Sequence, residues 1–112
     1  MHENVRDSAR RVLAVGVVID DSPLSPTAAL APDGILIVME GDPLRAEDAR
    51  RFLSTTGLAA RATVIGGDPR RMLYKLSGPF DVIFCHSAYL PLRDTLEKLL
   101  APEGVLITDG RQ

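Results

Sequence analysis

The sequence has no tryptophan and only one cysteine, Cys85, among 112 residues. A single cysteine cannot form an internal disulfide, which excludes the small secreted domains that depend on such bonds. The sequence also lacks a signal peptide and any apolar run long enough to span a bilayer. We therefore expect a cytoplasmic protein that has no membrane partner.

The sequence also lacks an excess of one charge. The 13 basic and 15 acidic side chains leave a net charge of -2, which gives no electrostatic reason to expect a nucleic-acid partner. Apolar residues make up 46% of the chain and charged residues 25%, as in ordered globular proteins. The length suits one core, so residues 1–112 are expected to form a single domain.

The stretch from Gly34 to Pro43, GILIVMEGDP, is the most informative segment. Its uninterrupted aliphatic run predicts a strand that is buried on both faces and ends at Glu40. An acidic side chain at the tip of such a strand can accept hydrogen bonds from the diol of a ribose. Alternatively, Glu40 and Asp42 only begin the next helix, where carboxylates suit the positive end of the helix dipole.

Segments rich in β-branched and aliphatic residues alternate with segments of helical spacing. This alternation predicts an α/β fold, a doubly wound parallel sheet with helices on both faces, because each crossover must cover the sheet. Residues 1–10 are polar and are expected to form a frayed lead-in or a short helix. The expected strands cover residues 11–18, 34–40, 61–65, 80–85 and 105–108. The expected helices cover residues 27–30, 43–56, 69–76 and 92–100, and residues 101–104 close the last of them.

The carboxyl ends of parallel strands meet at one edge of a sheet, where ligands bind in folds of this class. We therefore expect the residues that follow the five strands to converge on one rim. Those residues are 16–22, 40–42, 66–68, 85–87 and 109–110.

Four phrases at these positions carry a family resemblance: APDGILIVMEGDP, GGDP, GPFDVIFCHS and LLAPEGVLITDG. Together they resemble the class I S-adenosylmethionine-dependent methyltransferases, most closely the O-methyltransferases of the caffeoyl-CoA and catechol type, from about Val12 to Gly110. The resemblance implies a Rossmann-like five-stranded sheet of order 3-2-1-4-5. It also implies S-adenosylmethionine as cofactor and a small hydroxylated molecule as methyl acceptor.

The resemblance also assigns site residues. It places Glu40 at the cofactor ribose and Gly67 and Asp68 against the adenine, and the loop after the first strand brings Gly16 and Ser22 to the cofactor. His86 and Asp109, at the ends of the fourth and fifth strands, are the expected catalytic residues. On its residue type alone, His86 is more commonly a solvated loop histidine than a catalytic base, and a metal ligand is the least common of the three.

The sequence departs from the family pattern at several positions. Asp20 stands where the family has a glycine, and Ala14 stands where it has a glutamate. A carboxylate at position 20 facing the carboxylate of the cofactor would repel it by about 4 kcal/mol at ~4 Å and an effective dielectric of ~20. His86 and the pair Asp109-Gly110 replace oxygen ligands of the family's metal site, so we expect no magnesium ion. The family's segments before the first strand and after the fifth have no counterpart in this sequence.

Two functions follow from this pattern. The first is an S-adenosylmethionine-dependent O-methyltransferase with a degenerate cofactor loop. The second is a catalytically inactive module of the same fold that binds partners, with a homodimer formed through the exposed edge of the strand at residues 105–108. A receiver-like phosphoacceptor domain, suggested by Asp20 and Asp21, is disfavoured because the other strand ends lack the aspartate and lysine that it needs.

Overall fold

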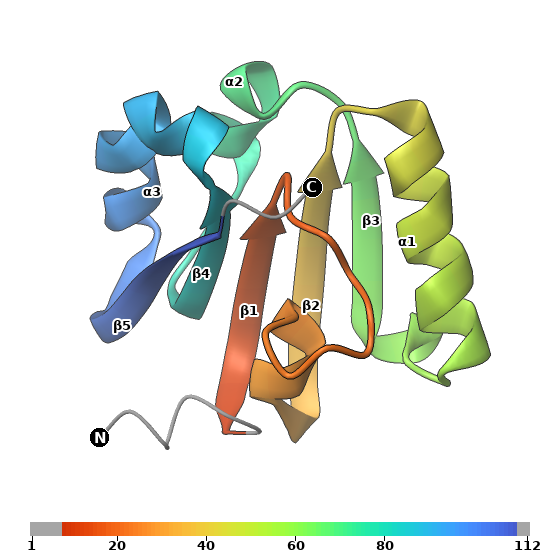
Figure 1. The fold of residues 1–112 in the computed structure, drawn as a ribbon. Coiled ribbons are helices and arrows are strands. Elements are labelled where there is room, and N and C mark those ends of the chain that lie inside the picture. Colours follow the sequence, from red (N-terminus) through yellow and green to blue (C-terminus); the bar gives the residue numbers. More distant parts are fainter. Residues whose placement is uncertain (1–7, 110–112) are drawn as a thin grey trace.

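The computed structural model describes residues 8–109 and contains one five-stranded parallel sheet of order β3-β2-β1-β4-β5 (Figure 1). This confirms the expected Rossmann-like order. The strands are β1 (Ala9–Val15), β2 (Leu30–Glu40), β3 (Ala62–Gly66), β4 (Phe80–His86) and β5 (Leu100–Asp109). Residues 1–7 of the expected lead-in and Gly110 lie outside the described part of the chain, whereas Ala9 and Arg10 already belong to β1.

Successive residues of β1 point to opposite faces of the sheet and are buried on both. Val12 and Ala14 belong to a core that is covered by α1 (Pro43–Thr55) and the connection from β1 to β2. Leu13 and Val15 belong to a second core, which contains Leu73 and, from α3 (Arg93–Lys98), Leu96. Helices therefore cover both faces, as predicted, and this burial explains why the strand sequences show no polar alternation.

The same tripeptide, Gly-Asp-Pro, follows both β2 and β3 and leads into the helix after each strand. Asp42 accepts a hydrogen bond from the backbone N–H of Leu44 at 2.9 Å, and Asp68 accepts one from that of Arg70 at 3.0 Å. Proline follows both aspartates at the first helical position, where its missing N–H costs nothing. The expected helix at 69–76 is α2 (Pro69–Met72) continued by the short 3-10 turn η4 (Leu73–Lys75).

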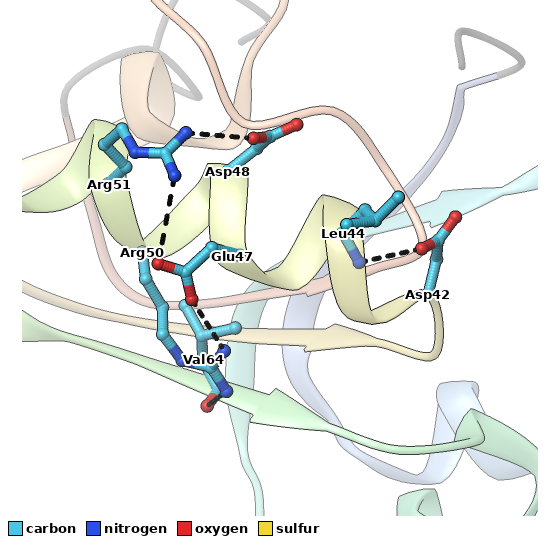
Figure 2. Close-up of polar contacts among 7 residues, drawn as sticks. All are labelled: Asp42, Leu44, Glu47, Asp48, Arg50, Arg51 and Val64. Atoms are coloured by element: carbon cyan, nitrogen blue, oxygen red, sulfur yellow. Dashed lines mark hydrogen bonds and ion pairs between the residues drawn. The ribbon is translucent and has the colours of Figure 1, made fainter.

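The outer face of α1 carries a network of charges (Figure 2). Arg51 pairs with Asp48 at 3.3 Å, and both Arg50 and Arg51 lie within 4.0 Å of Glu47. Arg50 also donates to the carbonyl oxygen of Val64 at 3.4 Å, which ties the helix to β3. The pairs within α1 are exposed and stabilise the helix only weakly.

The carboxyl end of β1 differs from the expected one. β1 ends at Val15 because Gly16 turns the chain with a φ of 70°, so Val17 and Val18 lie in the following loop rather than in the strand. That connection runs as an open loop to the 3-10 turn η2 (Pro26–Ala29), which matches the expected helix at 27–30 (Figure 1).

Strands β2 and β5 both begin earlier than expected, and each contains a register shift. Between the pairs Ala9/Leu30 and Arg11/Ile35, β2 advances five residues while β1 advances two. β5 does the same against β4, between Phe80/Leu100 and Val82/Val105. The prediction that residues 101–104 close a helix is therefore wrong. The sequences LAPDG and LAPEG bulge out of the ladder without leaving the strand.

Within residues 8–109, no helix has the length and apolar character needed to cross a membrane.

Candidate functional site

The structure brings three of the expected cofactor residues together at the carboxyl ends of adjacent strands. The N–H of Gly16 donates to the carbonyl oxygen of Met39 at 2.9 Å, so β1 stays paired with β2 up to the turn. The N–H of Gly67 donates to the carbonyl oxygen of Glu40 at 3.1 Å and joins the end of β3 to that of β2. Gly16, Glu40 and Gly67 thus form one continuous row across the edge of the sheet.

Glu40 is the acidic residue of this row and is buried, with 4% of its surface exposed. Its Oε2 accepts hydrogen bonds from the N–H of Asp42 at 3.0 Å and from the guanidinium of Arg45 at 3.4 Å. Both hydrogen bonds use Oε2 and hold the carboxylate in place at the strand end. A carboxylate has about four lone-pair sites, so Glu40 can accept further hydrogen bonds from a ligand.

A pocket of about 220 Å³ opens beside Glu40, between the loop after β1 and helix α1. Its apolar wall is formed by Val38 and Ala49 together with the loop residues 17–19, and its polar wall by Glu40, Arg45 and Asp48. Asp48 also forms an ion pair with Arg51 on the outside of the helix (Figure 2). The pocket thus combines an apolar surface with one buried carboxylate, which suits a small organic ligand with hydroxyl donors.

The crevice between the ends of β1 and β4 is occupied by Tyr89, which belongs to the 3-10 segment η5 (Ser87–Leu92). An ideal Cβ on Gly16 would lie 2.5 Å from Cε2 of the Tyr89 ring. The guanidinium carbon of Arg70 lies 5.3 Å from the ring centroid, and Arg70 bonds Asp68 at 3.2 Å. The residues that follow β1, β3 and β4 therefore meet at one aromatic ring.

The loop after β1 is closed by its own hydrogen bonds. The side chain of Asp20 accepts from the N–H of Ser22 at 3.1 Å, and the hydroxyl of Ser22 accepts from the N–H of Leu24 at 3.0 Å. Ser25 donates its backbone N–H to the carbonyl of Ser22. At least one carboxylate oxygen of Asp20 thus stabilises the turn itself, and Ser22 uses its side chain in the same way.

His86 ends β4 in register with Asp109, the last residue of β5. The imidazole is buried and its Nδ1 accepts the N–H of Ala88 at 3.0 Å, so His86 caps the segment η5. In a neutral ring with this hydrogen bond, the proton resides on Nε2. Among the residues described, no three His, Cys, Asp or Glu side chains are placed to hold a metal ion.

Two residues of the site were missed by sequence reasoning: Arg45, which bonds Glu40, and Tyr89, which covers Gly16. Arg45 lies in the first turn of α1, where a cation is unusual because it faces the positive end of the helix dipole, and this could have marked it. Tyr89 is one of only two tyrosines and comes three residues after a strand end. Its contact with Gly16 results from the packing of the two chain segments and cannot be predicted from the sequence.

The model of a protein family described as O-methyltransferase matches residues 5–110. A catechol O-methyltransferase of Mycobacterium tuberculosis is 36% identical over 77 residues, which is 68% of this chain and 35% of that protein.

Solved structures agree with this match. The O-methyltransferase TomG of Streptomyces achromogenes, involved in tomaymycin synthesis and solved in complex with S-adenosylmethionine, superposes with a TM-score of 0.80 at 29% identity, covering 96% of this chain and 51% of that one. An O-methyltransferase of Bacillus cereus in complex with S-adenosylhomocysteine gives a TM-score of 0.77 at 25% identity, with coverages of 90% and 49%. The chain spans about half the length of these two structures. With its sheet order, its row of strand-end residues and a family match over nearly its whole length, the chain belongs to the O-methyltransferase family.

Proposed function

We propose that the chain binds S-adenosylmethionine and takes part in transferring a methyl group to a hydroxyl group of a small molecule. The observation that carries this proposal is the Glu40 carboxylate, which is buried at a strand end and lines a pocket. Such a carboxylate suits the hydroxyl donors of a ribose. The relatives solved with S-adenosylmethionine and S-adenosylhomocysteine support the same cofactor for this chain.

The neighbouring residues fit this cofactor. Gly16 follows the neighbouring strand β1, where its φ of 70° favours glycine and an added Cβ would meet the Tyr89 ring. We assign Glu40 to the ribose and Gly67 and Asp68 to the adenine side. We assign Gly16 and Ser22 to the loop that faces the methionine end.

When bound, the cofactor supplies an electrophilic methyl group on its sulfonium sulfur. The task of the chain is then to align the acceptor and to take up the proton of its hydroxyl group. His86 and Asp109 are proposed for this task because they end neighbouring strands in register. His86 would have to give up its hydrogen bond with Ala88 before it could accept a proton at Nδ1, so Asp109 is the preferred proton acceptor.

Calorimetric titration of the chain with S-adenosylhomocysteine tests the cofactor site. We expect micromolar affinity for the wild type and at least a tenfold loss for Glu40→Gln, which keeps the shape of the side chain but removes its charge. Glu47→Gln is the matched control, because Glu47 lies on the outer face of α1 and does not line the pocket, and the affinity of this variant should equal that of the wild type. Equal binding by Glu40→Gln and wild type would contradict the assignment.

A second candidate function is an inactive module that binds partners as a dimer. Two observations favour it: the Tyr89 ring occupies the crevice over Gly16, and Asp20 and Ser22 close the cofactor loop with their own hydrogen bonds. If the wild type binds no S-adenosylhomocysteine and Asp20→Gly does, this loop blocks the site and the second function is supported.

The dimer that we propose forms through β5, which is the outermost strand of the described sheet and carries the 40% exposed Val105. Its outer backbone groups can pair with the same strand of a second copy. Light scattering should give twice the chain mass of 12.1 kDa, and Val105→Lys should shift the species toward the monomer. A wild-type monomer at micromolar concentration would contradict the dimer.

We also propose a cytoplasmic location, which is consistent with the buried free thiol of Cys85.

A further inference from the structure

We propose that the Tyr89 ring makes a cation–π contact with the sulfonium of the bound cofactor. We also propose that Arg70 takes this position on the ring while the site is empty. The inference rests on the proposed function and adds a positioning residue to it. It starts from the place of the ring, which is the crevice where the strand order of the sheet reverses between β1 and β4.

The first step is the distance between the ribose carboxylate and the ring. The register pairs Val15 with Met39, so Gly16 stands beside Glu40 on the neighbouring strand. Adjacent strands lie about 4.8 Å apart. The sulfonium sulfur is attached to C5′ of the ribose, so a ribose at Glu40 that extends toward β1 directs its sulfur toward the residues beside Gly16. The edge of the Tyr89 ring already lies against this glycine.

The second step is the chemistry of the ring. The guanidinium carbon of Arg70 lies 5.3 Å from the ring centroid, within the range of a cation–π contact, so the ring already accepts a cation in this structure. Arg70 is exposed and also forms an ion pair with the Asp68 carboxylate at 3.2 Å. Arg70 can keep this ion pair when its guanidinium moves off the ring. A sulfonium carries the same charge as a guanidinium and can replace it on the ring.

The third step is a difference between two ligands. S-adenosylmethionine carries the sulfonium charge, whereas S-adenosylhomocysteine has a neutral thioether at the same position. A cation–π contact therefore favours the first ligand only. Because the two ligands share the rest of the molecule, the change in the ratio of their dissociation constants on substitution of Tyr89 reports this contact.

The experiment is calorimetric titration of the wild type, Tyr89→Phe and Tyr89→Ala with each ligand. We expect Tyr89→Phe to keep the wild-type ratio, because the aromatic face remains. Tyr89→Ala should lose roughly fivefold more affinity for S-adenosylmethionine than for S-adenosylhomocysteine. Arg70→Gln should shift the ratio the opposite way, toward S-adenosylmethionine. Arg71→Gln removes an equal charge from the same helix and is the control, since no ring contact with Tyr89 is found for Arg71 in residues 8–109.

The outcomes separate this inference from the proposed function. Binding of both ligands by Tyr89→Ala with an unchanged ratio would overturn the sulfonium contact and leave the cofactor site intact. Equal shifts for Arg70→Gln and Arg71→Gln would overturn the role of Arg70, because a general charge effect would then explain both. A wild type that binds neither ligand overturns the proposed function and this inference with it.

Discussion

The Tyr89 ring lies against the backbone of Gly16 so closely that an added Cβ would sit 2.5 Å from its Cε2 atom. Gly16 also has a φ of 70°, which L side chains rarely adopt. We expect Gly16→Ala to lower the free energy of unfolding by about 2–4 kcal/mol, the sum of backbone strain and overpacking. Urea denaturation followed by circular dichroism measures this change.

Gly57 provides the matched control for that substitution. Its φ is 78°, yet no atom lies within 4 Å of an added Cβ. Gly57→Ala therefore reports the backbone cost alone, which we expect to be about 1 kcal/mol. If both variants lose the same stability, the contact with Tyr89 contributes nothing to the requirement for glycine at position 16.

The Asp42 cap stabilises the start of α1. Its carboxylate accepts the N–H of Leu44 at 2.9 Å, so Asp42→Ala should cost about 1 kcal/mol in thermal or urea unfolding. Asp42→Asn keeps an acceptor oxygen and should stay within a few tenths of a kcal/mol of the wild type. A large loss in the asparagine variant would show that the charge, rather than the hydrogen bond, is what matters.

Arg61 holds the bulge at the start of β2. Its guanidinium donates to the carbonyl oxygens of Gly34 at 2.8 Å and Ala31 at 3.2 Å. Arg61→Gln should lower the free energy of unfolding by roughly 1–2 kcal/mol, because two carbonyl groups lose a charged donor. Arg51→Gln is the control, since the ion pairs of Arg51 with Glu47 and Asp48 are exposed, and it should change stability by less than about 0.5 kcal/mol.

Burial raises the pKa of the Cys85 thiol from 9.0 to about 11. The native protein should therefore react with thiol reagents far more slowly than the urea-unfolded chain, which an absorbance assay measures. Between pH 9 and 11 the unfolded chain loses this proton and the folded one keeps it, so stability should fall as the pH rises. The fall should be on the order of 2 kcal/mol, and Cys85→Ala should lack this component. Identical pH profiles for both proteins would contradict the assignment.

The sequence was sufficient for the order of elements because the strand segments are apolar on both faces and the Gly-Asp-Pro caps mark helix starts. Those caps do not say which face a helix covers: Asp42 begins a helix on one face and Asp68 begins one on the other. That choice depends on packing across the whole sheet.

The candidate site was predictable where strand ends supply it, as at Glu40 and Gly67. The ion pair with Arg45 and the ring of Tyr89 depend on side-chain positions set by packing, which no local pattern encodes. The bulges were missed because Pro-Asp-Gly and Pro-Glu-Gly are common turn sequences. Here these residues form a bulge within a strand instead of a turn between two elements.

The two bulges lie at the amino-terminal edge of the sheet, far along β2 and β5 from the site. From Ile35 and Val105 onward, pairing with β1 and β4 fixes the position of every residue up to the strand ends. Residues added to or removed from 31–34 or 101–104 would change the size of a bulge without moving Glu40 or His86. One edge of the domain can therefore vary in chain length while the opposite edge keeps the spacing that a ligand requires.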